Sequence, residues 1–379
     1  MKIYLKNIGS CDLNYQHNYL KSEISKNANL IDNVADADVI VFTGTCACTE
    51  LQIISTVNEM IDILSCAKDS VKVYMTGCLT RSFTKDNSFL DKVNRWIREN
   101  IDCVVIQNDS NLLLEKLFGG DTYQQYIDFG GIAVGNGYAN IYISNGCLNK
   151  CSFCKMTYQD YPLKSADLDV IKLMIDYCEQ KNIADLRLLG TNISQYGIDN
   201  YGRCMLPEII EYIEQKKGIS KVSLIGFAFA DAIHNDLGDI IRDSRKISSI
   251  GGSLESGSDR ILKMMRKGFS SDELVRFINY IRGKHFKELE TTILAGFPTE
   301  TMEDVKLTLD VLKAINPSFV DVCRYIDSTF VDSHKYEQLD PEIIQEHARI
   351  YGKVLSRRRI KNVIQGDDYV CNNRLHEYE

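Results

Sequence analysis

Three cysteines near the middle of the chain have a spacing that suits a metal cluster. Cys147, Cys151 and Cys154 form a C-x3-C-x2-C pattern just after the apolar segment Ile141 to Ser144. Thiolates are soft ligands that bind iron–sulfur clusters or zinc. A structural zinc site needs a fourth Cys or His, and the segment from Asn140 to Ser165 has none. The pattern therefore favours a [4Fe–4S] cluster with one iron left open.

Three further cysteines, far apart in the sequence, each follow an apolar segment that we expect to be a strand. They are Cys11, Cys46 and Cys78. Open α/β sheets bind their ligands at the carboxyl ends of the strands, so these thiols are candidate metal ligands. Cys48 lies two residues from Cys46, and in an extended chain both side chains point the same way. The spacing alone does not choose between this pair.

The other cysteines stand at spacings that suggest no site, and we interpret them as ordinary buried thiols. These are Cys48, Cys66, Cys103, Cys178, Cys204, Cys323 and Cys371. The total of 13 is odd and the start of the chain lacks the apolar core of a signal peptide, which argues against a disulfide framework.

Predicted strands and helices alternate through the first part of the chain. We predict strands over Lys2–Leu5, Val39–Phe42, Val71–Met75 and at Val104–Val105, and helices over Tyr15–Lys26, Glu50–Leu64 and about Asp91–Glu99. This alternation is typical of a parallel sheet with crossover helices. A Gly-rich segment, Phe129 to Asn140, then marks a boundary, and its GG and NG pairs predict a hinge or hairpin.

Strand and helix patterns alternate again after this boundary. The strands are predicted in YISNGC, LRLLGTNIS, KVSLIGF, SSIGGSLESG, LETTILAGFP and FVDVCRYI, and a long final helix is predicted from Pro341. Repeated strand–helix units predict a full or partial (β/α) barrel, in which the loops after the strands carry the chemistry.

The loop NGCLNKCSFCK, with the aromatic Phe153 before its last cysteine, resembles the signature of the radical S-adenosylmethionine (SAM) superfamily. LLGTNISQYG, LESGSDRILKMMRKGF and TTILAGFPTET resemble the strand-end motifs of radical SAM methylthiotransferases, and the resemblance runs from about residue 1 to 365. It implies an α/β fold: an N-terminal parallel-sheet methylthiotransferase domain over residues 1–130 and a radical SAM partial (β/α)6 TIM barrel over 131–366. The family's C-terminal β-barrel domain is not expected in the short tail 367–379.

The resemblance also implies the cofactors. One [4Fe–4S] cluster on Cys147, Cys151 and Cys154 would bind SAM at its open iron, and a second, auxiliary cluster on the N-terminal domain would donate sulfur. The second set of ligands would be Cys11, Cys46 and Cys78, so resemblance selects Cys46 over Cys48.

Four polar residues at predicted strand ends are candidate SAM contacts by the same resemblance: Thr191, Asn192, Glu255 and Ser256. The alternative for each is a polar residue in a turn or a helix cap. Phe153 belongs to the cluster-binding signature itself.

Composition restricts location and partners. Lys and Arg number 44 against 52 Asp and Glu, so the formal charge is -8 and no global basic field is available for a nucleic acid. No segment is apolar enough for a membrane span, and we expect a cytoplasmic protein. An external electron donor such as flavodoxin or ferredoxin is implied by the family's chemistry.

The expected reaction is methylthiolation of an unactivated C–H bond, and a peptide or protein substrate, including a ribosomally made peptide, is favoured over tRNA. The segment KMTYQDYPLKS after Cys154 lacks the Arg-rich stretch of the tRNA-modifying members, although the run from Arg260 to Lys287 is basic. We interpret that run as a solvated helix face. Two alternatives stay open: a two-cluster radical SAM enzyme with a different product, and a non-enzymatic iron–sulfur regulator or carrier.

Overall fold

The computed structural model describes residues 1–8, 14–45, 50–77, 79, 103–105, 110–119, 132–134, 137–158, 162–282, 286, 288–329 and 331–364. These residues fall into two compact units, one within Met1–Gly131 and one within Ile132–Asp367. The predicted division at residue 130 and the predicted helix near Asp91–Glu99 lie outside the described residues.

The first unit contains a five-stranded parallel sheet in the order β2-β1-β3-β4-β5. Its strands are β1 (Lys2–Asn7), β2 (Asn29–Leu30), β3 (Val39–Thr45), β4 (Lys72–Gly77) and β5 (Cys103–Val105), and its helices are α1 (Asn14–Asn27), α2 (Glu50–Ser65) and α5 (Ser110–Phe118). The chain runs outwards in both directions from β1 and β3. In doubly wound sheets of this kind, ligands bind at the carboxyl ends of the strands where the direction changes, which here are β1 and β3.

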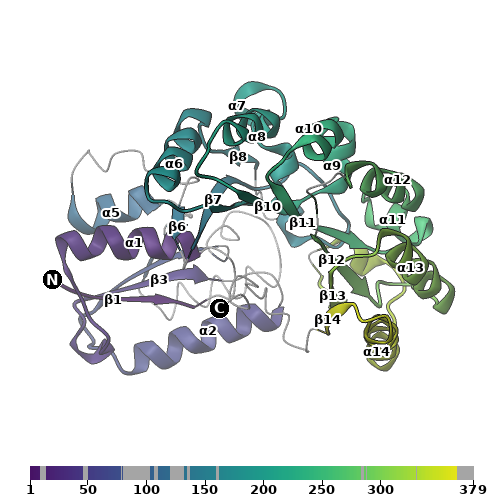
Figure 1. Ribbon diagram of the computed structural model, residues 1–379. Helices are drawn as coiled ribbons and strands as arrows, with labels where there is room; N and C mark the ends of the chain where they lie inside the picture. Colours follow the sequence, from purple (N-terminus) through teal and green to yellow (C-terminus); the bar gives the residue numbers. More distant parts are fainter. Residues whose placement is uncertain are drawn as a thin grey trace. The chain divides into compact units, whose positions relative to one another are not determined.

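Alternation along β3 explains how this sheet buries both faces. Val39 and Val41 join a core cluster with Leu20 and Ile24 of α1 and with Leu113 and Leu114 of α5. Ile40 and Phe42 are equally buried and, because strand side chains alternate, face the opposite side. Figure 1 shows α1 and α2 on opposite faces of the sheet, so each set of residues has a covering helix.

The second unit is built on a larger sheet in which β7 and β9 to β13 are neighbours and parallel. Its strands are β6 (Ile132–Val134), β7 (Tyr138–Asn145), β8 (Lys164–Ser165), β9 (Asp185–Gly190), β10 (Lys221–Phe227), β11 (Ile247–Glu255), β12 (Glu288–Ala295), β13 (Phe319–Arg324) and β14 (Lys361–Ile364). Six parallel strands in chain order confirm the predicted partial barrel.

Helices connect successive strands of this sheet and lie along its outer side in Figure 1. They are α6 (Leu168–Gln180), α7 (Ile198–Tyr201), α8 (Leu206–Glu214), α9 (Phe229–His234), α10 (Gly238–Asp243), α11 (Asp259–Met265), α12 (Ser271–Ile281), α13 (Met302–Ile315) and α14 (Pro341–Arg357). Capping boxes fix where two of these helices begin. Ser270 and Glu273 form the box at the start of α12, and Thr301 and Asp304 form the box at the start of α13.

Two details add to the sequence prediction. The Gly-rich boundary does form a hairpin, because β6 and β7 are antiparallel and pair Val134 with Ala139. The strand β14 was not predicted; it adds to the edge of the sheet beside β13, after the final helix. Its four residues carry too short a pattern to distinguish it from a loop. Among the described residues no helix combines the length and the apolar character of a membrane span.

Candidate functional site

The three central cysteines lie in the loop that leaves the carboxyl end of β7. Gly146 precedes the first of them with φ +82°, a left-handed conformation that favours glycine. A Cβ atom at Gly146 would lie 2.0 Å from the carbonyl oxygen of Pro162. Glycine is therefore required for the chain to turn from the strand into Cys147 so close to the Pro162 backbone.

Backbone contacts fix the second half of this loop to distant elements. The Ser152 N–H donates to the Met265 carbonyl at the end of α11 (3.0 Å), and the Ser152 carbonyl accepts from the Ser333 N–H (3.0 Å). The ring of Phe153 meets the ring of Phe297 edge-on, with centroids 6.4 Å apart. The predicted signature aromatic thus anchors the cysteine loop to the turn after β12.

Thr191 and Asn145, at neighbouring strand ends, fix the start of the cysteine loop. The Thr191 hydroxyl donates to Asn145 Oδ1 (3.0 Å) and accepts from the Gly146 N–H (3.2 Å). The parallel strands β7 and β9 end at the same edge, which is why residues 46 positions apart in the chain meet.

Asn192 contacts a candidate ligand directly. Its Nδ2 lies 3.4 Å from the Cys147 sulfur and 2.8 Å from Asp231 Oδ2. The side chain is buried, yet its Oδ1 has no hydrogen-bond partner. A buried amide oxygen without a partner is costly, and a donor on a bound ligand would satisfy it.

Sequence reasoning missed Gln195 and Asp231, which lie behind the loop. Gln195 accepts from the Leu148 N–H (2.8 Å) and donates to Asp231 Oδ1 (2.9 Å), and Asn149 donates to Asp231 Oδ2 (2.6 Å). Asp231 lies in α9, and no pattern in the sequence around it signals a site. Only the barrel brings these side chains together.

Glu255 ends β11 in an unusual backbone conformation. Its φ is +66°, and the pairing of β11 with β12 shifts register between Ser253 and Glu255. Left-handed non-glycine residues store strain and cluster at functional sites. The side chain is nearly buried and lies 3.5 Å from Lys267 Nζ. The register shift and the left-handed backbone therefore set how Glu255 meets Lys267.

Lys267 brings a positive charge to the cysteine loop. Burial lowers the pKa of Lys267, but Glu255 and the thiols of Cys151 and Cys154 outweigh burial, so this pKa is raised. The side chain is only 14% exposed. A buried ammonium group beside thiols favours an anionic occupant.

Burial disfavours ionisation of two of the three thiols. Burial raises the pKa of Cys147 against the hydrogen bonds from Asn192 and Asn149, and burial likewise raises the pKa of Cys151. Bound iron deprotonates a coordinating thiol outright. Within the described residues no three His, Cys, Asp or Glu side chains converge on one metal ion. A [4Fe–4S] cube does not require this, because each cysteine binds a different iron, so the residues fit a cluster better than zinc.

Ser256 makes its contacts inside the protein. Its hydroxyl lies 3.3 Å from the Thr308 hydroxyl of α13 and accepts from the Ser258 N–H (3.2 Å). The side chain is fully buried. This is the turn-polar alternative considered for Ser256, and we leave it out of the binding set proposed below.

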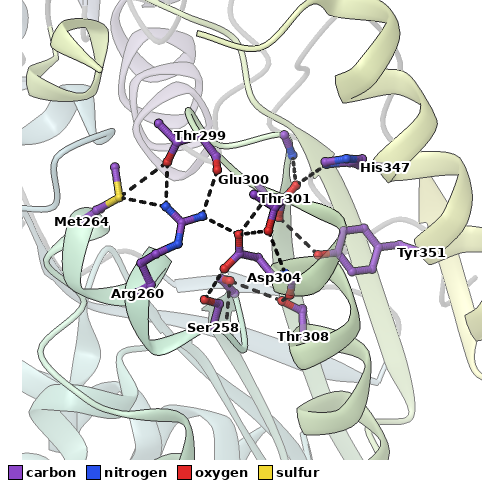
Figure 2. Close-up of polar contacts among 12 residues, drawn as sticks. Ser258, Arg260, Met264, Thr299, Glu300, Thr301, Asp304, Thr308, His347 and Tyr351 are labelled. Atoms are coloured by element: carbon purple, nitrogen blue, oxygen red, sulfur yellow. Dashed lines mark hydrogen bonds and ion pairs between the residues drawn. The ribbon is translucent and has the colours of Figure 1, made fainter. Parts of the chain in front are cut away.

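A buried polar network supports the strand ends at β11 and β12 (Figure 2). Glu300 accepts from the Gly296 N–H (2.6 Å), and its carboxylate also meets His347 and Tyr351 of α14. Asp304 accepts from the Ser258 hydroxyl (2.6 Å) and pairs with Arg260. The turn after β12 is thereby joined to α11, α13 and α14.

The N-terminal cysteines Cys11, Cys46 and Cys78 lie outside the described residues, as does Cys48. The strands that lead to them are described. Cys46 directly follows β3, Cys78 directly follows β4, and Cys11 comes four residues after β1. The sheet order makes β1, β3 and β4 adjacent and parallel, so their carboxyl ends meet at one edge.

Most of the described basic residues in the run from Arg260 to Lys287 are exposed, as the predicted solvated face requires, and several of them also form tertiary contacts. Within it Arg260 pairs with Asp304, Arg266 with Asp332, and Lys267 with Glu255, while Arg282 donates to backbone carbonyls. These partners lie on other elements of the barrel. The run is therefore a largely exposed face whose ion pairs also connect neighbouring elements of the barrel.

Residues 141–312 match the family model described as the radical SAM superfamily. The cysteine loop at the end of the first parallel strand of a partial barrel defines the same class, so a [4Fe–4S] cluster and SAM are the expected cofactors.

The chain is 26% identical over 356 residues to the ribosomal protein uS12 methylthiotransferase RimO of Thermosipho africanus, covering 90% of this chain and 78% of that relative. It is 28% identical over 302 residues to the probable threonylcarbamoyladenosine tRNA methylthiotransferase of Archaeoglobus fulgidus, covering 78% and 69%. Over most of its length the chain is thus similar to radical SAM methylthiotransferases, and these comparisons support an enzyme of that class.

A solved structure shares the fold. The radical S-adenosylmethionine methyltransferase TsrM of Kitasatospora setae aligns with a TM-score of 0.56 over 88% of this chain and 74% of that one. Sequence identity is 11%, so the likeness concerns architecture alone.

Proposed function

We propose that this enzyme transfers a methylthio group to an unactivated C–H bond of a polypeptide, using SAM and two [4Fe–4S] clusters. The observation that carries the proposal is the presence of cysteines after adjacent parallel strands in the first unit, in addition to the cysteine loop of the barrel. A radical SAM enzyme with a single cluster needs only the second of these features, whereas a two-cluster enzyme with a different product would share both and is distinguished by the mass of its product.

The barrel site would hold the first cluster and SAM. Cys147, Cys151 and Cys154 are the proposed ligands, and the bound group would supply reductive cleavage of SAM and hydrogen abstraction from the substrate. The residues of this chain orient it: Asn192 donates to the Cys147 sulfur and offers a free carbonyl oxygen. Glu255 and Lys267 place one carboxylate and one ammonium group beside the loop, which matches the amine and carboxylate of a methionine moiety.

Thr191 and Phe153 would act through the loop. Thr191 fixes its start through Gly146, and Phe153 anchors its end on Phe297. Both hold the thiols in place without needing to touch SAM.

The auxiliary cluster is proposed on Cys11, Cys46 and Cys78. A sheet with the order β2-β1-β3-β4-β5 presents ligands at the carboxyl ends of its central strands. Three thiols at neighbouring strand ends suit a cluster that keeps one iron open to carry sulfur.

A polypeptide substrate is favoured by charge. The chain is net -8, and three basic residues of that run, Arg260, Arg266 and Lys267, are engaged in ion pairs, which disfavours their contact with phosphate. Several relatives, including that of Thermosipho africanus, are uS12 methylthiotransferases, which supports a protein substrate. The narrower prediction of a ribosomally made peptide has no support from relatives.

A tRNA substrate is the second candidate, because other relatives are named as tRNA methylthiotransferases. An electron donor such as flavodoxin or ferredoxin and a location in the cytoplasm belong to the same proposal.

Iron analysis and product mass test this function. Changing Cys147, Cys151 and Cys154 to Ala should remove about half of the roughly eight irons of two four-iron clusters and abolish 5′-deoxyadenosine formation. Changing Cys11, Cys46 and Cys78 should also halve the iron but leave SAM cleavage intact. Unchanged iron in the second variant would contradict the auxiliary cluster, and a product without added sulfur would favour the two-cluster alternative.

Substrate class is tested with the unaltered enzyme, uS12 and bulk tRNA. A mass increase of a methylthio group on the protein is the expected result. Binding of tRNA that weakens steeply with salt, together with a methylthio-nucleoside after turnover, would favour the tRNA candidate.

A further inference from the structure

Asp231 lies beside the cysteine loop but is not one of the proposed cluster ligands. It lies half-buried in α9, after β10, and its carboxylate accepts three side-chain amide hydrogen bonds. Within the described part of the chain no Lys, Arg or His lies within ion-pair distance of it. Its negative charge is therefore spread over amide dipoles rather than neutralised by a cation.

Each of the three amides holds a different part of the cysteine loop. Asn149 lies between Cys147 and Cys151, and its own N–H points at the Cys147 sulfur (3.4 Å). Gln195 binds both the Leu148 N–H (2.8 Å) and Asn149 Oδ1 (3.1 Å). Two of the three residues between the first two cysteines are thus fixed through side chains that Asp231 orients.

The third amide connects Asp231 to a thiol. Asn192 shares its Nδ2 between Asp231 Oδ2 (2.8 Å) and the Cys147 sulfur (3.4 Å). Both neighbours are acceptors, so the amide nitrogen must face them. The carboxylate is thereby linked to the sulfur through one intervening group.

We propose that Asp231 is a positioning residue that sets both the conformation of the cysteine loop and the reduction potential of the cluster bound there. This inference rests on the proposed assignment of a cluster to Cys147, Cys151 and Cys154. Hydrogen bonds to cluster sulfurs and nearby net charge are the protein's main means of tuning such potentials.

The two groups act on the potential with opposite sign. The N–H of Asn192 withdraws electron density from the Cys147 sulfur and stabilises the reduced cluster, which raises the potential. The charge of Asp231 disfavours an added electron, which lowers it. A residue that only maintained the fold would not produce paired shifts of opposite direction.

The experiment compares three variants of the full-length protein after cluster reconstitution: Asp231→Asn, Asn192→Leu and Asp236→Asn. Asp236 is an exposed residue just beyond α9 and serves as a control with the same change of charge. The readouts are iron content, thermal unfolding of the protein without iron, and an EPR-monitored redox titration. The titration is run in the background where Cys11, Cys46 and Cys78 are Ala, so that one cluster is observed.

We expect Asp231→Asn to shift the midpoint potential upwards and to lower iron content, Asn192→Leu to shift it downwards, and Asp236→Asn to change neither. Potentials of Asp231→Asn and Asn192→Leu equal to that of the control would overturn the inference. If Asp231→Asn does not fold, the test rests on Asn192→Leu alone. An unchanged midpoint potential in Asn192→Leu would then contradict the inference. Loss of all iron in the background protein before any of these changes would instead contradict the proposed cluster assignment.

Discussion

His347 Nδ1 lies 2.8 Å from Glu300 Oε2, and both side chains are buried. The pair joins α14 to the turn that follows β12. Glu300 also accepts from the Gly296 N–H and from the Tyr351 hydroxyl, so three donors surround one carboxylate. The C-terminal helix thus takes part in holding a strand-end turn whose Phe297 packs against the cysteine loop.

Replacing Glu300 by Ala should therefore destabilise the barrel unit. Three buried donors would lose their acceptor, and a loss of about 3 kcal/mol in the free energy of unfolding is expected for a broken buried pair of this kind. Denaturant unfolding of the protein without iron measures it. Glu303→Ala is the matched control, because Glu303 lies three residues further along the chain, in the first turn of α13, and is exposed. Equal midpoints for the two variants would contradict this account.

Gly146→Ala should abolish cluster binding at the barrel site. The new Cβ would meet the Pro162 carbonyl at 2.0 Å, so the loop carrying Cys147 has to move. Gly202→Ala is a sharp comparison, since Gly202 also has a positive φ (+70°) but nothing within 4 Å of its Cβ position. The second variant should lose only about 1 kcal/mol of stability and no iron. Iron analysis separates them, and full iron content in Gly146→Ala would show that the loop accommodates a side chain.

Asp304 should make stability depend on acidic pH. Burial opposes its ionisation, but Arg260, Ser258 and Thr301 outweigh burial and lower the pKa of Asp304 to about 2. Because the folded pKa lies below the ordinary value of 3.8, the stabilising contribution is present above about pH 4 and is lost as pH falls towards 2. About two pKa units correspond to roughly 2.5 kcal/mol.

The pH dependence is measured by unfolding the iron-free protein between pH 2 and about 6, a window that spans both pKa values. Asp304→Asn should flatten the dependence, whereas Asp310→Asn, an exposed change in the same helix, should leave it intact. Parallel curves for the two variants would show that another group is responsible.

Lys267→Met should weaken SAM binding by about tenfold or more, which corresponds to ~1.4 kcal/mol. The change removes an ammonium group that lies beside Glu255 and the thiols, and it leaves a nearly buried carboxylate without this ion-pair partner. Equilibrium binding of SAM to the reconstituted protein is the measurement. Lys263→Met, an exposed change in α11, serves as the control. If Lys267→Met bound SAM as tightly as Lys263→Met does, Lys267 would not be part of the SAM-binding site.

Cys48 should be dispensable and Cys46 required for the auxiliary cluster. Cys46 directly follows the last residue of β3, which is the position that the proposed site uses. Cys48→Ala should therefore retain all iron, and Cys46→Ala should lose the second cluster. The reverse result would show that the other member of the pair is the ligand.

The sequence by itself determined the class of protein, the alternation of strands and helices, and the cysteine loop. These depend on local information: apolar periodicity, and ligands spaced within eight residues from Cys147 to Cys154. Glu255 and Asn192 could be named from strand-end motifs because parallel strands place their carboxyl ends at one edge.

The tertiary structure alone decided which side chains support that loop. Asp231 is 84 residues from Cys147 and Glu300 is 47 residues from His347, and neither pair shares a local pattern. It also decided that Ser256 faces α13 and that Arg260 and Lys267 form ion pairs, whose partners the charge pattern does not identify. Burial and pairing depend on what packs against a residue, and only the folded partial barrel of β7 to β13 with its helices supplies those neighbours.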